Sequence, residues 1–305
     1  MDLKQILTFI KIEHTLFSLP FVLIGYLIAY DQFIDQLPKS DFGWFRIDLL
    51  WILIAAIGAR GLAMALNRII DREIDANNPR TEQRHLASGA MSLRTAWTLA
   101  TAFLVMLLIG AGALNKVALM MAWLPVLAFV VYPYTKRFTW ACHFWLGLCL
   151  GLAPAGAWVA MAADVHGWAA ITGQLSTGTE YLWLPTILPI SLGVTLWIAA
   201  FDINYARMDV KSDIENQIHS FPAKFGDNAT TRTTIQLTLL WFACFAVSDP
   251  ISSLWFLGAS ALMAGLNIYV VLARERLKDF QNTLFQTSMF TGWALLIALA
   301  IGLYL

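Results

Sequence analysis

Repeated apolar stretches constrain the fold of this chain more than any other feature of its sequence. A membrane-spanning helix needs about 20 mostly apolar residues, and nine stretches approach that length. They lie at 13–30, 48–68, 94–114, 117–133, 140–162, 182–203, 233–248, 251–272 and 284–304. The stretches 117–133 and 233–248 are short for a full crossing, so they are either inner helices with polar ends or spans whose boundaries lie elsewhere. The pattern predicts an all-α, polytopic membrane bundle of nine transmembrane helices.

The composition supports a membrane protein and argues against a nucleic-acid partner. Hydrophobic residues make up 59% of the 305 residues and charged residues 13%. This is more apolar surface than a soluble domain of this length needs for its core, so we expect the lipid bilayer to cover much of it. The net charge is zero, so no overall field favours nucleic acid. No linker divides the chain, and residues 1–305 are predicted to form a single transmembrane domain.

Basic residues gather on one side of the predicted membrane. If the N-terminus and alternate loops face the same side, that side holds 16 of the 20 Lys and Arg residues. Only Lys39, Arg46 and Lys116 fall on the other side, and Arg60 lies inside the second stretch. Lysine and arginine accumulate on the cytoplasmic side of short loops. We therefore predict an integral protein of a prokaryotic-type plasma membrane, with its N-terminus and its long charged loops, 67–94 and 202–232, in the cytoplasm.

Two rows of acidic and amide residues follow apolar stretches on this cytoplasmic side. The first row has the spacing i, i+4, i+8 and the second i, i+7, i+11, so each lies along one face of a helix. The first row is Asn67, Asp71 and Asp75, and the second is Asp202, Asp209 and Asp213. Clustered carboxylates repel one another and are costly to desolvate near a membrane. Because hard oxygen ligands suit Mg²⁺, the two rows are predicted to hold a diphosphate between them through the metal.

Each row alone has a simpler interpretation, a solvated helix end with salt bridges to Arg68, Arg72, Arg207 or Lys211. Two rows that each directly follow an apolar stretch favour the metal site. Basic partners for phosphate groups are available on the same side: Lys136 and Arg137, which follow Tyr132-Pro133-Tyr134-Thr135, together with Arg72 and Arg84. Ordinary anchoring by positive charge explains Lys136 and Arg137 about as well on spacing alone.

Arg60 is a separate candidate because it lies within an apolar stretch. It precedes Asn67 by seven residues and so points along the same helix face, roughly 10 Å deeper. An arginine at that depth is by default a functional candidate that faces an interior cavity. A carboxylate on an aromatic acceptor would be a natural bidentate partner for it. The competing interpretation pairs Arg60 with a helix carbonyl or with a buried acid such as Glu13.

These motifs carry a family resemblance. Asn67-x-x-x-Asp71-x-x-x-Asp75 resembles the first aspartate-rich motif of the UbiA superfamily of intramembrane prenyltransferases, and the segment from Asp202 to Asp213 resembles the second. The resemblance covers nearly the whole chain, through Tyr132-Pro133-x-x-Lys136-Arg137, Arg80-Thr81-x-x-Arg84 followed by Ser88-Gly89, and His219-Ser220-x-Pro222-x-x-Phe225-Gly226.

Some positions separate this chain from other members. Arg68 stands where many members have aspartate, and Ala87 stands where proline often precedes the Ser-Gly pair. Arg68, the pair Glu13-His14 and the run 202–206 are most similar to the 4-hydroxybenzoate-type branch, which includes relatives placed in a menaquinone route. The geometry of the first metal site is expected to differ accordingly.

The resemblance implies a central cavity, capped on the cytoplasmic side by the two acidic loops. Asn67, Asp71 and Asp75 would hold one Mg²⁺, and Asp202, Asp209 and Asp213 a second. The substrate-binding residues would be Arg60, Arg72, Arg84, Lys136, Arg137 and Tyr205. The expected reaction is Mg²⁺-dependent transfer of a prenyl group from an isoprenyl diphosphate to an aromatic acceptor, 4-hydroxybenzoate or a related naphthoate, in quinone biosynthesis, with the five aspartates as catalytic residues.

Two alternatives stay open. Within the same family, the acceptor would be haem or a glycerol-phosphate lipid instead of an aromatic acid. In a different class, the acids would form the ion path of a cation-coupled transporter, whose acids should lie near the bilayer midplane. The acids here cluster at helix ends on one side and no inverted repeat relates the two halves, which favours the enzyme.

Overall fold

The structure, a computed structural model, describes residues 3–37, 46–173, 181–248, 250 and 252–304. Lys39 and the side chains of Glu13 and His14 lie outside this description, so their predicted places are not tested. The described residues form helices and contain no β-strand. The prediction of an all-α fold is confirmed.

Eight segments of the described chain are long and apolar enough to cross a membrane. Six of them are the single helices α2 (Ile12–Phe33), α3 (Ile47–Ile70), α5 (Leu93–Leu114), α8 (Cys142–His166), α13 (Leu254–Leu272) and α14 (Phe280–Tyr304). A seventh combines α6 (Lys116–Met121) with α7 (Trp123–Thr135) and corresponds to the short predicted stretch 117–133. The eighth is Ile187–Glu215, which begins with α10 (Ile187–Tyr205).

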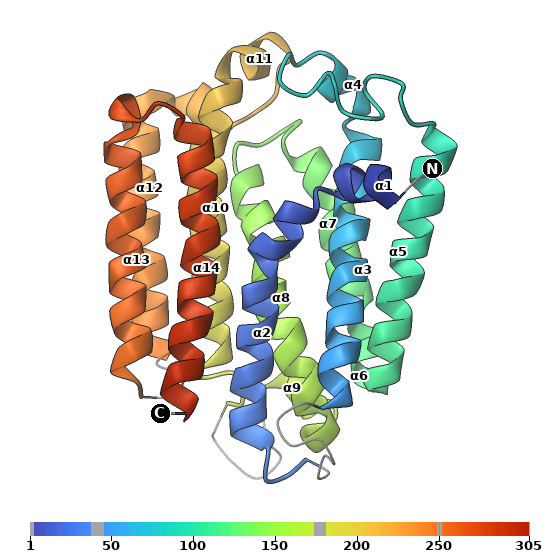
Figure 1. Cartoon of the computed structure of the whole chain (residues 1–305), viewed down its shortest axis with the longest axis vertical. Coiled ribbons are helices and arrows are strands. Elements are labelled where there is room, and N and C mark those ends of the chain that lie inside the picture. Colours follow the sequence, from blue (N-terminus) through green and yellow to red (C-terminus); the bar gives the residue numbers. More distant parts are fainter. Residues whose placement is uncertain (1–2, 38–45, 174–180, 249, 251, 305) are drawn as a thin grey trace.

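The predicted count of nine spans is not confirmed. The stretch 233–248 lies in α12 (Phe221–Ser248), which is not among the eight segments. The backbone of α12 is kinked at Gly226 (φ 76°), and its first half carries Lys224, Asp227, Arg232 and several threonines. The helical part after the kink is therefore longer and more polar than the stretch predicted. Figure 1 nevertheless shows α12 running beside α10 and α13 along most of the bundle.

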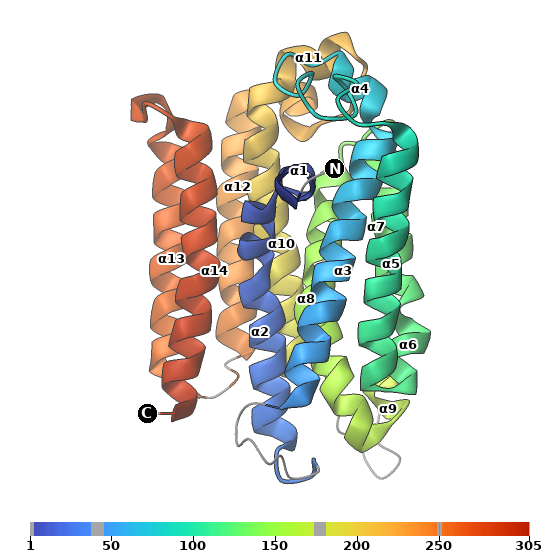
Figure 2. The ribbon, with the colours of Figure 1, turned by 45° about the vertical axis from the view of Figure 1, so that its right-hand side comes forward.

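The long helices stand roughly parallel and divide into two groups (Figures 1 and 2). In one group α10 packs against α8 and α12, and α13 packs against α12 and α14; in the other, α3 packs against α5 and α7. Glycines permit close contacts between these helices. A Cβ at Gly110 of α5, for example, would lie 2.7 Å from the backbone nitrogen of Ala55 in α3. The helix α2 joins the groups, since it contacts α8, α14 and α3.

Short elements gather at one end of the bundle, the upper end in Figures 1 and 2. They are α4 (Arg72–Ala76), η1 (Ala206–Asp209) and α11 (Val210–Glu215), and together with residues 77–92 and 216–220 we call them the charged end. The helix α1 (Leu3–Ile10) lies across the bundle close to this end, while α9 (Ala169–Thr172) lies at the opposite end (Figure 1). A short turn, η2 (Arg274–Arg276), connects α13 to α14.

Neither acidic row lies on one uninterrupted helix. The helix α3 ends at Ile70, but Asp71 N–H donates to Asn67 O at 3.0 Å and Asp75 N–H to Asp71 O at 2.8 Å, so the first row keeps its helical spacing. In the second row Asp202 belongs to α10, Asp209 to the 3-10 turn η1 and Asp213 to α11. The tighter 3-10 turn alters the predicted i, i+7, i+11 register between these helices.

Candidate active site

A cavity of about 920 Å³ leads from the charged end into the bundle. Its walls come from the helices α1 to α3 and α5 to α10, and from the segments at the charged end. Both acidic rows reach it, because Asn67, Asp75, Asp202, Asp209 and Asp213 line it, whereas the predicted ligand Asp71 does not. Below this mouth the lining is almost entirely apolar, apart from Arg60, Tyr132 and a few small polar groups. The two rows that lie far apart in the sequence therefore share one entrance.

Asp71 is the most buried of the five aspartates, with 1% of its surface exposed. Its Oδ2 accepts a hydrogen bond from Asn67 Nδ2 at 2.8 Å and lies 2.6 Å from Lys136 Nζ. Arg137 Nη2 lies 3.7 Å from its Oδ1. Burial raises the pKa of the Asp71 carboxyl above its usual range, and the positive charge of Lys136 opposes that rise. Lys136 thus compensates a carboxylate that would otherwise be costly to bury.

Asp75 is held by two arginines. Arg84 Nη1 donates to its Oδ1 at 2.7 Å, and Arg68 Nη1 lies 3.8 Å from its Oδ2. The oxygens Asp71 Oδ1 and Asp75 Oδ2 are buried and accept no hydrogen bond. Because buried carboxylate oxygens normally have a partner, each has capacity left for a cation.

The second row is tied to the loop that follows the first row. Arg80 donates two hydrogen bonds to Asp209, from Nε at 2.7 Å and from Nη2 at 2.5 Å. Asn78 Nδ2 donates a third at 3.0 Å. This fork geometry is the strong, bidentate form of the arginine–carboxylate pair. It fixes residues 77–92 across the mouth of the cavity.

Asp202 has a neutral partner. His143 Nε2 accepts a hydrogen bond from the Phe221 N–H at 3.0 Å, and His143 Nδ1 lies 2.7 Å from Asp202 Oδ2. A nitrogen that accepts from an N–H carries no proton, so the proton of His143 resides on Nδ1 and is donated to Asp202. His143 connects α8, α10 and the start of α12, and it orients the Asp202 carboxylate without neutralising its charge.

Tyr205 and Asp213 complete the mouth. Tyr205 lines the cavity, and its hydroxyl accepts a hydrogen bond from Gln281 Nε2 of α14 at 2.6 Å. The guanidinium of Arg80 lies 5.5 Å from the centre of the Tyr205 ring, within the range of a cation–π contact. Asp213 is 9% exposed and faces the same space.

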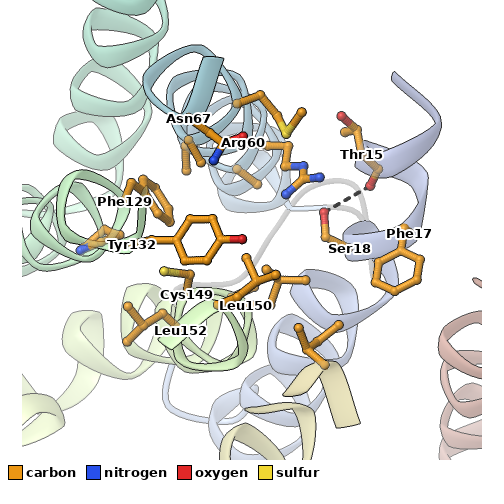
Figure 3. A pocket seen from close by; sticks show the side chains of 18 of the residues that line it. Thr15, Phe17, Ser18, Arg60, Asn67, Phe129, Tyr132, Cys149, Leu150 and Leu152 are labelled. Atoms are coloured by element: carbon orange, nitrogen blue, oxygen red, sulfur yellow. Dashed lines mark hydrogen bonds between the residues drawn. The ribbon is translucent and has the colours of Figure 1, made fainter. Parts of the chain in front are cut away.

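Arg60 lies deeper in the cavity, as its position in the sequence predicts. Figure 3 shows its guanidinium and the Tyr132 hydroxyl pointing toward the same space, with Ser18 of α2 nearby. The Nε of Arg60 is buried and has no hydrogen-bond partner, and no described residue forms an ion pair with Arg60. The alternative partner Glu13 has a side chain outside the described part of the chain.

The structure gives the other predicted site residues different surroundings. Lys136 and Arg84 line the cavity. Arg72 does not; its side chain is 46% exposed and pairs with Glu73 at 3.3 Å. Arg137 is 42% exposed and donates to the carbonyl oxygen of Ile70 at 2.8 Å. Contacts of Arg72 and Arg137 with substrate stay predictions.

Three residues at the mouth were not predicted as site residues. Arg80 and Asn78 belong to the loop after the first row, and Arg80 opens the Arg80-Thr81-x-x-Arg84 motif, which was available as a signal. His143 had a weaker signal, a lone polar side chain at the start of the apolar stretch 140–162. Its spacing alone did not point to Asp202, which lies 59 residues later.

The donor set suits Mg²⁺ only together with a phosphate ligand. Among the residues that the structure describes, no group of three His, Cys, Asp or Glu side chains is arranged to hold a metal ion. Magnesium usually takes one or two carboxylates and completes its octahedron with water and phosphate oxygens. The free oxygens of Asp71 and Asp75 and the uncompensated Asp202 fit that requirement.

Comparison with known proteins agrees with this geometry. The profile of the UbiA prenyltransferase family matches residues 18–295. A 4-hydroxybenzoate octaprenyltransferase of Haemophilus ducreyi is 27% identical, over 84% of this chain and 87% of its own length. A UbiA homologue from Aeropyrum pernix K1, solved in its apo form, has a TM-score of 0.71 and 28% identity, over 95% of this chain and 97% of that one.

A second solved structure agrees in fold alone. A UbiA homologue from Archaeoglobus fulgidus bound to GPP and Mg²⁺ has a TM-score of 0.62 at 16% identity, over 99% of this chain and 100% of that one. The resemblance inferred from the motifs is confirmed, because the family profile covers most of the chain. The chain is an integral membrane prenyltransferase that belongs to the UbiA prenyltransferase family, in its 4-hydroxybenzoate polyprenyltransferase-like branch.

Proposed function

We propose that this enzyme transfers a polyprenyl group from an allylic diphosphate to an aromatic acid of the 4-hydroxybenzoate type, in a Mg²⁺-dependent step of quinone biosynthesis. The observation that carries the proposal is Arg60, which has a buried Nε without a hydrogen-bond partner and no ion pair with any described residue, in an otherwise apolar cavity below a mouth that both acidic rows reach. The related enzyme of H. ducreyi is named a 4-hydroxybenzoate octaprenyltransferase, and the A. fulgidus homologue was solved bound to GPP and Mg²⁺.

The diphosphate occupies the mouth. Asn67, Asp71 and Asp75 would hold one Mg²⁺, and Asp202, Asp209 and Asp213 would hold a second. Magnesium bound there would stabilise the charge of the leaving diphosphate. Lys136, Arg80 and Arg84 line the same space and donate to the remaining phosphate oxygens. The side chains of these three cations are 20–28% exposed, so each can reorient toward a phosphate oxygen while it stays near the carboxylate with which it pairs.

The acceptor lies between the mouth and Arg60. The guanidinium binds the carboxylate in a bidentate pair, which turns the ring toward the allylic carbon. The carbon–oxygen bond to the diphosphate breaks, a ring carbon forms the new carbon–carbon bond, and that carbon loses its proton. The aromatic and aliphatic walls exclude water from the allylic cation until the ring attacks it.

The orientation in the membrane follows the charge pattern. We place the charged end in the cytoplasm, because the basic residues of the loops concentrate there. With α12 counted as a crossing helix, the bundle has nine crossing helices, and α4, α11 and residues 77–92 cap the cavity at the charged end. The diphosphate then enters from the aqueous side, and the apolar tail lies among the helices.

The test is a transfer assay with purified protein in lipid vesicles, an allylic diphosphate and a panel of acceptors, with products identified by mass spectrometry. Asp71→Asn is expected to abolish transfer and Mg²⁺-dependent binding of a non-hydrolysable prenyl diphosphate. Glu73→Gln is the matched control, because Glu73 is exposed and two residues away. Full activity of Asp71→Asn at limiting Mg²⁺ refutes the metal assignment. Products formed only with haem or a glycerol phosphate refute the aromatic acceptor.

A further inference from the structure

The cavity continues well past the acceptor site. Along α8 its lining runs from His143 at the mouth to Ala160, and it extends to Leu114 and Ala118 of α5 and α6 and to Ile171 of α9. Gly156 follows His143 by thirteen residues, which places it about 20 Å below the mouth at 1.5 Å per residue. Space at this depth is not needed for the reacting groups.

Gly156 is the one glycine among the described residues that line the cavity. No heavy atom lies within 4 Å of the place where its Cβ would stand. Two other glycines of α8 differ, because a Cβ at Gly147 or Gly151 would collide with Thr195 of α10. Those two glycines permit helix packing, whereas the missing side chain of Gly156 only enlarges the cavity.

The depth of Gly156 converts into a number of isoprene units. An extended peptide covers about 3.3–3.6 Å with three backbone bonds, so the four bonds of an isoprene unit cover roughly 4.5 Å. About four units therefore reach from a diphosphate at the mouth to Gly156. Shorter tails end above it.

We propose that Gly156 is a specificity-determining residue that keeps the cavity open for long polyprenyl diphosphates, those with more than about four isoprene units. The proposal rests on the proposed function, since it assumes a diphosphate at the mouth and a prenyl tail along α8. A side chain at position 156 fills the path of the tail. It leaves the mouth and Arg60 untouched, because both lie on the near side of the obstruction.

The experiment compares two donors, geranyl diphosphate with two isoprene units and octaprenyl diphosphate with eight, on wild type, Gly156→Leu and Gly156→Ala. Gly156→Leu is expected to lower kcat/KM for the octaprenyl donor at least tenfold and to change the value for the geranyl donor less than twofold. Gly156→Ala is expected to show a smaller loss in the same direction. The matched control is Gly265→Leu in α13, where a Cβ also meets nothing but the residue does not line the cavity; neither donor should be affected.

The geranyl reaction reports whether each variant is folded and active. Equal losses with both donors, or no loss with the octaprenyl donor in either variant, overturn the role of Gly156 while leaving the prenyl transfer reaction in place. A wild type that transfers neither donor overturns the proposed function and this inference with it.

Discussion

Replacing Arg60 with methionine is the sharpest test of how the acceptor is held. Methionine keeps an unbranched side chain and removes the charge and every donor. Losing one partner of a desolvated, hydrogen-bonded charge pair costs about 2–5 kcal/mol. At 1.4 kcal/mol per factor of ten, the KM for 4-hydroxybenzoate is expected to rise roughly 30-fold to several thousand-fold. Arg60→Lys should fall between, because an ammonium keeps the charge but not the planar fork.

The structure separates this effect from misfolding. Arg60 has an unsatisfied buried Nε and no ion-pair partner among the described residues, so its removal deprives none of those residues of an ion-pair partner. Burying an uncompensated charge is unfavourable, and the unfolding temperature of Arg60→Met is therefore expected to equal or exceed that of wild type. The KM for the prenyl diphosphate should stay within about twofold, because Arg60 lies roughly 10 Å below Asn67.

An acceptor without the carboxylate completes the assay. Wild type and Arg60→Met should prenylate phenol with the same kcat/KM, while they differ strongly for 4-hydroxybenzoate. This is a double-mutant cycle in which one partner is the carboxylate of the substrate. If Arg60→Met slows both acceptors equally, Arg60 does not bind the carboxylate and the assignment is wrong.

Two further substitutions probe how the site is positioned. The amide of His143→Asn can replace the Nδ1 donor to Asp202, so this variant should keep most of the Mg²⁺-dependent binding of a non-hydrolysable prenyl diphosphate. His143→Ala should weaken that binding at least tenfold. Equal binding by both variants contradicts the positioning role. Gly25→Ala should lower stability by about 1–3 kcal/mol through overpacking, because its Cβ would lie 2.7 Å from the Pro154 Cα in α8. Thermal unfolding measures this, and Gly112→Ala, with no contact closer than 3.7 Å, should change the unfolding temperature little.

The apolar pattern predicted most of the fold because a lipid environment demands long, satisfied helices. The boundaries of α3 and α5 lie within two residues of those predicted. The prediction was least accurate at 233–248, where the helix extends back to a kink at Gly226 (φ 76°), and a separate short helical segment precedes the kink from Phe221. Hydropathy underestimates a helix whose polar residues find partners inside the bundle. Thr234 of α12 does so, since its hydroxyl accepts from Asn204 Nδ2 at 2.7 Å.

Most residues of the candidate site were predictable from the sequence, but the ion pairs between them were not. Spacing predicted that the aspartates of each row share one side of a helix, which holds for the first row but not across the 3-10 turn η1 of the second. It also predicted that Arg60 lies on the same helix face as Asn67. It does not reveal which cation reaches which carboxylate. Arg80 and Asp209 are 129 positions apart in the sequence. They meet in space because α3 and α10 converge at the charged end.

The pairing has a consequence for binding that the sequence alone does not convey. Three of the five aspartates, Asp71, Asp75 and Asp209, form ion pairs with five cations, Arg68, Arg80, Arg84, Lys136 and Arg137. Asp202 and Asp213 pair with none of these cations and bring the total to five negative charges against five positive ones, and His143 adds no charge. The mouth is therefore balanced before substrate arrives. A diphosphate alone would add uncompensated negative charge in a partly buried place, which is strongly unfavourable. Tight binding of the diphosphate should consequently require a divalent cation, and removal of Mg²⁺ should abolish donor binding while the affinity of Arg60 for the acceptor persists.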